Sequence, residues 1–418
     1  ISYTRYFNPA ADKCSRTVLV LISGYASTTA CFDPIARYIA SKTDIEVWTI
    51  NRPETLNENR KLLSQDVVEF QSYPQRRTEI LGKMNDISRY CNQSCAEICN
   101  LGFGNQLGYI NSIIEKAFVT HKNVFLGGWS DGVEYVMAYS CSNFMMEQEK
   151  VRRIKGLVMF DENPEWGRQE NNPGNAAAKS GAEDLNIRKG KCYITTHPSP
   201  AIHYLALVLA REDPDGKSPL TSLFRLPLEL SRRGMSNRAL IGWMYDWSVK
   251  GHAPAARSRF AWLIGSGDLS MEIKQGMNSG IIQWRSYRET GELSDIDHVI
   301  ETGARMGGFL EFYYPRAVIR DYWKIAQNKF HCPDIGLRQR KLGKMPVFFV
   351  QSSMNNTGKT TPSGLSWYLG KSGIPRSSVT MLRLYRFAHM DLFFSHSSPE
   401  ELFNPLISWI NSALSGEK

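Results

Sequence analysis

The 418-residue chain has no apolar run near the roughly 20 residues that a membrane-spanning helix needs, so no such helix is predicted. It also lacks internal repeats and any motif typical of nucleic-acid-binding proteins, and we predict no nucleic-acid partner. The net charge is +9, but the basic residues are scattered apart from a few short clusters. We interpret these clusters as solvated surface, with affinity for an anionic surface as the alternative. The composition, 42% hydrophobic and 22% charged, is that of an ordinary globular protein.

The eight cysteines permit disulfides without demonstrating them. Cys91, Cys95 and Cys99 recur at every fourth position, which on a helix places them on one face. Residues with that spacing on one helix rarely bridge each other, so a disulfide from this group is expected to reach another segment. No histidine accompanies the group, and we predict no metal site there.

The first residue is Ile1, with no methionine and no signal peptide. A processed, exported protein begins in this way, and so does a trimmed chain. Segments 92–94 and 355–357 match the acceptor pattern for N-glycosylation, which matters only in a eukaryotic secretory setting. We therefore expect a secreted, periplasmic or secretory-pathway protein.

The most informative feature is the pentapeptide Gly128-Trp129-Ser130-Asp131-Gly132. It follows the apolar run 124–126 and precedes the helix-like stretch 133–139. Strand, then Gly-x-Ser-x-Gly, then helix is the context of a nucleophile elbow, in which a tight turn exposes the serine hydroxyl above a sheet. Such a turn strains the serine backbone and leaves no room for side chains at the flanking glycines. The alternative is a chance Gly-Ser turn.

Short apolar runs alternate with helical patterns on both sides of this pentapeptide. Strands followed by helices in this way predict a mostly parallel sheet with helices on both faces, an α/β fold. The predicted strands are 17–22, 46–50, 124–126, 156–160, 346–350 and 379–384, and the predicted helices are 32–41, 106–119, 133–139, 363–372 and 399–415. Residues 51–104 are polar, and we interpret them as an irregular excursion.

The alternation breaks between Asp161 and about residue 335. This stretch is rich in aromatic residues and too long for a connection, so it predicts an inserted, mainly helical cap. The predicted domains are a core of residues 1–162 and 336–418 and a cap of residues 163–335. Within the cap, 167–190 is expected to be a loop, and helices are expected near 199–211, 217–232, 236–249, 256–264 and 299–328.

A serine nucleophile needs a base, and catalytic groups in such folds gather after the carboxyl ends of strands. His389 is the histidine placed just beyond a predicted core strand, and we predict that it is the base. Asp391 is too near in sequence to orient that ring and is expected to stabilise the loop. After the strand 17–22 comes Ser23-Gly24-Tyr25, where the backbone N–H groups of Tyr25 and Asp131 can form an oxyanion hole.

The pentapeptide, the turn Ser23-Gly24-Tyr25 and the loop Ala388-His389-Met390-Asp391 together resemble the α/β-hydrolase superfamily, in its lipase and esterase branch. The resemblance covers about residues 1–160 and 340–418, and the segment between is similar to a cap domain by position only. It implies an α/β-hydrolase fold with the cap inserted after the strand that follows the nucleophile helix.

The triad acid is where this chain departs from the family pattern. The acid usually follows the penultimate strand, but the residues after Val350 include no carboxylate. Some members carry the acid one strand earlier, and there Asp161 directly follows the apolar run. We predict Asp161 as the acid, with Glu162 as the second choice and Asn355 or Asn356 as the third. A structural capping role for Asp161 is the alternative.

These residues predict a serine hydrolase that cleaves carboxylic esters with a hydrophobic acyl or aromatic part, without a metal or organic cofactor. The partner is a small-molecule ester. An amidase, thioesterase or acyltransferase with the same triad is one alternative. A non-catalytic binding protein is another, motivated by the missing acid after Val350 and by the serine that replaces the family's usual histidine at position 23. The sequence leaves the oligomeric state open.

Overall fold

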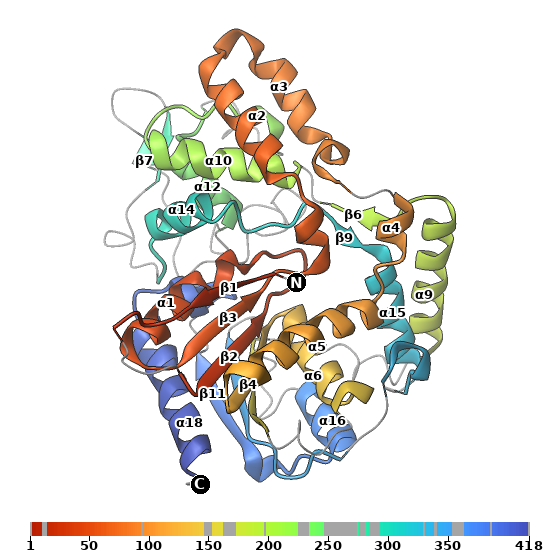
Figure 1. The fold of residues 1–418 in the computed structure, drawn as a ribbon. Helices are drawn as coiled ribbons and strands as arrows, with labels where there is room; N and C mark the ends of the chain where they lie inside the picture. Colours follow the sequence, from red (N-terminus) through yellow and green to blue (C-terminus); the bar gives the residue numbers. More distant parts are fainter. Residues whose placement is uncertain are drawn as a thin grey trace.

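The computed structural model describes residues 2–10, 15–92, 95–145, 153–161, 173–195, 198–224, 234–245, 274–275, 281–284, 293–328, 331–337, 341–352, 363–384 and 387–416. A seven-stranded sheet lies at its centre, with strand order β1-β3-β2-β4-β5-β10-β11 (Figure 1). Strand β1 runs antiparallel to β3, and every other neighbouring pair is parallel. The strands are β1 (Tyr3–Tyr6), β2 (Thr17–Ile22), β3 (Glu46–Ile50), β4 (Asn123–Trp129), β5 (Ile154–Phe160), β10 (Val347–Ser352) and β11 (Val379–Leu384).

Helices cover both faces of the sheet because β2 and its neighbours are apolar on both sides. Leu19 and Leu21 of β2 belong to the apolar cluster that includes the first and last core helices. Val18 and Val20, which point the other way, belong to the cluster on the opposite face. The first face carries α1 (Asp33–Lys42) and α18 (Asn404–Ser415), and the second carries α5 (Phe103–Thr120), α6 (Asp131–Ser140) and α16 (Ser363–Ser372) (Figure 1).

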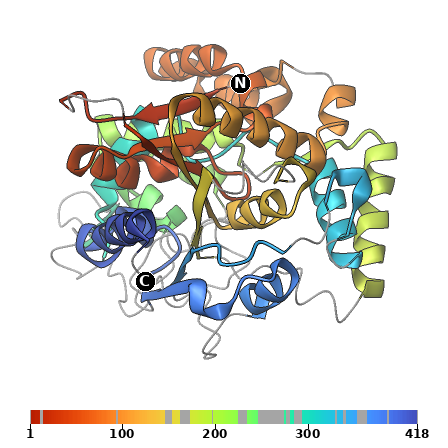
Figure 2. The same cartoon turned by 60° about the horizontal axis from the view of Figure 1, so that its bottom comes forward.

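The segment between β5 and β10 is an insertion in the sheet. Its helices are α9 (Pro173–Arg188), α10 (Pro200–Glu212), α12 (Asn237–Tyr245), α14 (Ile296–Arg305) and α15 (Arg316–Gln327), with two small strand pairs, β6 (Tyr193–Ile194) with β9 (Tyr314–Pro315) and β7 (Lys274–Gln275) with β8 (Ile282–Gln283). Helix α10 packs against α12 and α14, whereas α9 and α15 lie side by side as a separate pair (Figure 1, Figure 2).

The predicted fold class, a mostly parallel sheet flanked by helices, is confirmed. Each predicted core strand is present, and 17–22, 46–50 and 379–384 agree with the observed bounds. The edge strand β1 was not predicted, since it is four residues long and mostly polar. In the described part of the chain, the longest and most apolar helices still fall short of what a membrane crossing requires.

Three expectations about local structure were wrong. Residues 51–104, expected to be an irregular excursion, contain α2 (Arg60–Ser72), α3 (Arg77–Asn85) and α4 (Cys95–Cys99). Helix α2 is stabilised by the burial of one of its faces. Residues 173–188, expected to be a loop, form α9, which has little apolar periodicity of its own and is held by packing on α15. The helix expected over 299–328 is divided into α14 and α15 because Gly307 and Gly308 adopt positive φ angles of 83° and 96°. In addition, the helix expected over 217–232 is not found in its described part, because 217–224 hold only the 3-10 turn Thr221–Leu223. Residues 225–232 and the helix expected at 256–264 lie outside the described residues.

Candidate active site

Three residues other than glycine have positive φ angles in the described part of the chain. They are Ala26, Ser130 and Asp161, with φ values of 49°, 56° and 53°. Each follows the carboxyl end of a strand, and the strands concerned, β2, β4 and β5, are neighbours in the sheet. Such a conformation costs about 1–3 kcal/mol per residue and persists where the surrounding structure enforces it, most often at functional sites. The strain therefore marks one region at the carboxyl edge of the central strands.

Ser130 occupies a turn so tight that its flanking positions have no room for a side chain. A Cβ atom on Gly128 would lie 2.1 Å from the carbonyl oxygen of Gly132, and one on Gly132 would lie 2.1 Å from the carbonyl oxygen of Ile22. The Ser130 N–H donates to the carbonyl of Phe160 at 3.0 Å, and α6 begins at the next residue. The crowding and the strain predicted for this pentapeptide are both present.

His389 and Asp161 meet across the sheet edge. His389 lies in the loop between β11 and the short helix α17 (Asp391–Phe394), and its Nδ1 is 2.6 Å from Oδ2 of Asp161. Both side chains are buried, with 1% and 0% of their surface exposed. The structure thus brings together two of the residues predicted for the site, from positions 228 residues apart.

Asp161 accepts two further hydrogen bonds, both from Ser352 at the end of β10. The Ser352 N–H donates to Oδ1 at 2.7 Å, and its hydroxyl donates to Oδ2. A carboxylate can accept several donors at once. Strand β10 therefore supplies donors to a carboxylate that follows the neighbouring strand β5.

The ring of Trp129 links the histidine to the nucleophile turn. Trp129 directly precedes Ser130, and its ring centroid lies 4.6 Å from that of His389. On its other side it makes an edge contact with Phe393 of α17 at 5.8 Å. These contacts fix the plane of the imidazole next to the elbow.

The predicted oxyanion turn passes directly over Ser130. A Cβ atom on Gly24 would lie 2.7 Å from Cβ and 3.2 Å from Oγ of Ser130, so only glycine fits at this position. The turn is closed by the Ser27 N–H, which donates to the Gly24 carbonyl at 3.2 Å, and by the Ser23 hydroxyl, which donates to the Ser27 carbonyl at 2.8 Å. Tyr25 lies within this turn, and Asp131 follows Ser130 at the start of α6.

Asp391 stabilises the loop that carries His389 through hydrogen bonds to its carboxylate. Its carboxylate accepts the Ala388 N–H at 2.8 Å and the hydroxyl of Ser294 at 2.5 Å. These contacts agree with the loop-stabilising role expected for it. The remaining candidates for the acid, Glu162, Asn355 and Asn356, lie outside the described residues.

Ser352 and Ala26 were not identified from the sequence. Ser352 had a usable signal, because it is a polar residue at the end of the strand after which an acid was sought. Ala26 had none, since nothing in its sequence context requires a positive φ angle. Among the described residues, no three His, Cys, Asp or Glu side chains are grouped so as to hold a metal ion.

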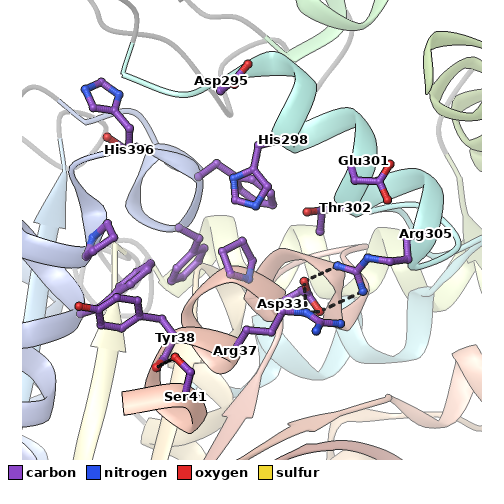
Figure 3. Close-up of a pocket in the computed structure, with 16 residues that line it drawn as sticks. Asp33, Arg37, Tyr38, Ser41, Asp295, His298, Glu301, Thr302, Arg305 and His396 are labelled. Carbon is purple, nitrogen blue, oxygen red and sulfur yellow. Dashed lines mark hydrogen bonds and ion pairs between the residues drawn. The ribbon is translucent and has the colours of Figure 1, made fainter. Parts of the chain in front are cut away.

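A separate pocket of about 840 Å³ lies between α1, α14 and the segment from Phe393 to Phe403 (Figure 3). One of its walls is the buried carboxylate of Asp33, which binds the guanidinium groups of both Arg37 and Arg305. Its lining does not include any residue predicted for the site.

The strand order, the strained elbow after β4 and the histidine loop after β11 are those of the α/β-hydrolase fold that the resemblance implied. Compared by sequence, the chain matches no protein-family model and no curated protein.

Compared by structure, the chain is similar to MenH from S. aureus, with 12% identity, a TM-score of 0.39 and coverage of 99% of this chain and 98% of that one. It is also similar to a soluble variant of monoglyceride lipase from Saccharomyces cerevisiae, with 11% identity, a TM-score of 0.44 and coverage of 98% and 91%. An esterase from Thermogutta terrifontis is 8% identical, with a TM-score of 0.39 and coverage of 99% and 93%. Likeness at this level concerns the course of the chain and carries no argument about activity.

Proposed function

We propose that this chain is a serine hydrolase that cleaves carboxylic esters with a hydrophobic acyl or aromatic part through an acyl-enzyme. One observation carries the proposal. The three strained residues other than glycine in the described chain are the nucleophile, the acid and a member of the oxyanion turn, and they follow three neighbouring strands. Strain collected at one sheet edge is what a preorganised site would produce and what a chance Gly-Ser turn would not.

In the proposed reaction, Ser130 Oγ attacks the ester carbonyl while His389 Nε2 takes its proton. Asp161 accepts the hydrogen bond from His389 Nδ1, which selects the tautomer with a basic Nε2 and stabilises the imidazolium as it forms. His389 then gives its proton to the leaving alcohol, and an acyl group remains on Ser130. Water, deprotonated by the same histidine, releases the acid and restores the serine.

The backbone N–H groups of Tyr25 and Asp131 are the proposed donors to the tetrahedral oxyanion. The closeness of Gly24 to Ser130 supports this, because it brings the turn within van der Waals contact of the nucleophile. Loss of one such donor typically raises the barrier by about 3 kcal/mol. This chemistry requires no metal or organic cofactor.

The substrate class follows from the apolar character of the insertion next to this turn. Phe309 and Leu310 are each 3% exposed. The Phe309 carbonyl accepts the N–H of Thr28, which directly follows the oxyanion turn. Apolar groups in such a position suit an apolar acyl or aromatic group and exclude water from the oxyanion site. We propose that the insertion, with predicted bounds 163–335, acts as the cap.

An oxidising compartment is part of the proposal. Cys99 of α4 forms a disulfide with Cys192, 93 residues away in the insertion, in line with the expectation that this cysteine group would bridge to another segment. Disulfides of this kind persist in exported proteins. Alkylation of the unfolded, unreduced protein would leave Cys99 and Cys192 unmodified, and their modification would contradict this part.

Hydrolysis of a series of p-nitrophenyl esters of increasing acyl length tests the proposal. The wild-type chain is expected to turn over the medium and long acyl esters faster than acetate, and Ser130→Ala is expected to lose at least about 10⁴-fold in kcat. A matching series of thioesters and anilides separates an esterase from the same triad used on other acyl compounds. Ester hydrolysis that persists in Ser130→Ala would refute the proposed function.

A further inference from the structure

Residues 305–314 of the insertion, which we call the strap, run alongside the oxyanion turn. The Thr28 N–H donates to the carbonyl of Phe309 at 2.9 Å, and the Thr28 hydroxyl donates to the carbonyl of Gly308 at 2.7 Å. In the other direction, the Glu311 N–H donates to the carbonyl of Ala26 at 3.0 Å. The strap therefore pairs with the turn as a short antiparallel bridge.

Side chains of the core hold the strap at both ends. At its start, Arg305 binds Asp33 of α1 with Nη2 2.5 Å from Oδ2 (Figure 3). Further along, the Phe312 N–H donates to Oε1 of the buried Glu58 at 2.7 Å. The strap is thus fixed to the core on both sides of the point where it meets the oxyanion turn.

The most deeply buried of these anchors is the ion pair between Glu311 and Arg52. Arg52 follows β3, and the two side chains are each 1% exposed. The guanidinium binds both carboxylate oxygens, with Nε 2.9 Å from Oε1 and a second hydrogen bond from Nη2 to Oε2. Planar pairs with two hydrogen bonds fix geometry as well as charge.

The charged form of Glu311 depends on Arg52. Burial raises the pKa of Glu311 well above its ordinary value, the nearby carboxylates Glu54 and Glu58 act in the same direction, and Arg52 opposes both effects. Arg52 is therefore the group that favours the charged form of Glu311. Removal of Arg52 would leave the buried Glu311 without its counterpart, which is the costly way to break such a pair. Without Glu311, Arg52 would keep Glu54, whose Oε1 lies 3.4 Å from its Nε.

Arg52 extends this anchor to the turn by a second route. Its guanidinium carbon lies 5.2 Å from the ring centroid of Tyr314, and that ring packs against Tyr25 with centroids 4.4 Å apart. Glu311 consequently reaches the turn twice, through its own N–H to Ala26 and through Arg52 and Tyr314 to Tyr25.

The turn needs such support because Ala26 is strained, with a φ angle of 49°. A positive φ angle is unfavourable for a residue other than glycine, so the conformation persists only where the surrounding contacts hold it. The Ala26 carbonyl is held by Glu311, and the Ala26 conformation sets the course of the turn that presents the N–H of Tyr25. An oxyanion donor that is not held in place is worth little to the transition state.

We propose that Glu311 is a positioning residue for the oxyanion turn, acting through its backbone bond to Ala26 and its buried ion pair with Arg52. The oxyanion site is then a joint product of the core and the insertion. This inference rests on the proposed function, because it assigns the turn a role only if Ser130 is acylated.

The expected signature is a loss of kcat without a change in KM, because the oxyanion interaction is made in the transition state. Glu311→Gln keeps the shape of the side chain and removes its charge, and kcat is expected to fall about 30-fold. Glu311→Asp keeps the charge on a shorter arm, and its kcat should lie between those of the wild type and Glu311→Gln. The double variant Arg52→Gln/Glu311→Gln, which removes both charges of this pair and leaves Glu54 its hydrogen bond from Gln106, should recover part of the loss.

A matched control is Glu183→Gln. Glu183 of α9 pairs with Arg316 of α15 at 2.8 Å, within the insertion and outside the strap. This variant loses an ion pair of the insertion and is expected to keep kcat. If Glu311→Gln does not fold, the comparison of Glu311→Asp with Glu183→Gln decides the question.

The experiment is steady-state ester hydrolysis by these variants and by Ser130→Ala, with kcat expressed per folded molecule. A lowered kcat at constant KM in the Glu311 variants, with partial recovery in the double variant, supports the inference. An unchanged kcat in both Glu311 variants, or a rise in KM alone, overturns it. Activity that persists in Ser130→Ala overturns the proposed function itself, whereas an inactive Ser130→Ala beside a normal Glu311→Gln overturns only the role of Glu311.

Discussion

The imidazole Nδ1 of His389 lies 2.6 Å from Oδ2 of Asp161, a carboxylate that follows β5 rather than β10. Asp161 reaches this position in a strained conformation, with a φ angle of 53°, and its N–H donates to the carbonyl of Val350 at 3.0 Å. The neighbouring strand β10 ends in Ser352, which donates twice to the same carboxylate. The Asp161–His389 pair is thus supported by two strands and a loop. A residue that only capped a strand would not require so many contacts.

Replacement of Asp161 by asparagine is predicted to lower kcat by about 10³–10⁴-fold. The amide retains the shape of the side chain but neither selects the same histidine tautomer nor stabilises the imidazolium. Steady-state ester hydrolysis measures the effect. Asp66→Asn is the control, because Asp66 is also buried and accepts the hydroxyl of Tyr90 at 2.5 Å, but lies on α2. More than a tenth of wild-type activity in Asp161→Asn would place the acid elsewhere.

Ser352→Ala removes one hydrogen bond to Asp161 and leaves the backbone N–H in place. A hydrogen bond to a charged group is worth about 1.5–3 kcal/mol, so kcat is predicted to fall roughly 10- to 100-fold with KM little changed. Ser372→Ala deletes another buried hydroxyl, which donates to the carbonyl of Tyr368 within α16, and should leave kcat unchanged. Equal kcat values for the two variants would argue against a role of Ser352.

Gly24→Ala is predicted to lower kcat by about 10²-fold or more while the protein remains folded. The added methyl group would lie 2.7 Å from Cβ of Ser130, so either the turn or the nucleophile must move. A displacement of the reacting groups by about 1 Å lowers the rate about 10²-fold or more. Gly82→Ala in α3 meets no atom within 4 Å and is expected to be fully active and slightly more stable. An active Gly24→Ala would contradict the proposed course of the oxyanion turn.

Stability is predicted to fall with decreasing pH, in part because of His203. Burial lowers the pKa of this side chain to about 3, against an ordinary value of 6.5. Between these values the unfolded chain binds a proton that the folded chain does not. The contribution to stability is therefore complete above pH 6.5 and is lost on acidification, by at most about 1.4 kcal/mol per pH unit. Urea unfolding between pH 4.5 and 7.5 should show a shallower pH dependence for His203→Phe, and identical slopes would contradict this assignment.

The core of the fold was predictable because its strands are continuous apolar runs. A strand buried on both faces, such as 17–22, needs no tertiary information to be recognised. The insertion was predictable in part, since α10 and α12 occur where helices were expected near 199–211 and 236–249. Helix α9, which packs on α15, has little apolar periodicity and was expected to be a loop. The break between α14 and α15 was overlooked because a pair of glycines in an apolar pattern can be tolerated in a helix or can end it.

The candidate site was predicted in part. Ser130 and His389 follow from their places after strands. Asp161 was chosen because the residues after Val350 include no carboxylate and the resemblance allows an acid one strand earlier. The proximity of Asp161 to His389 supports that choice, and its catalytic role remains a prediction. Glu311 was out of reach, because its partner Arg52 lies 259 residues away and no local pattern indicates the pair. Ser352 was overlooked although it ends the strand after which an acid was sought.

The central claim, that Ser130 is an activated nucleophile, is tested most directly by reaction with a fluorophosphonate and by mass spectrometry of the labelled peptides. We predict one adduct, on Ser130, that is absent from Ser130→Ala and from His389→Ala and much slower to form in Asp161→Asn. Labelling at another residue, or equal labelling of the wild type and His389→Ala, would contradict the account.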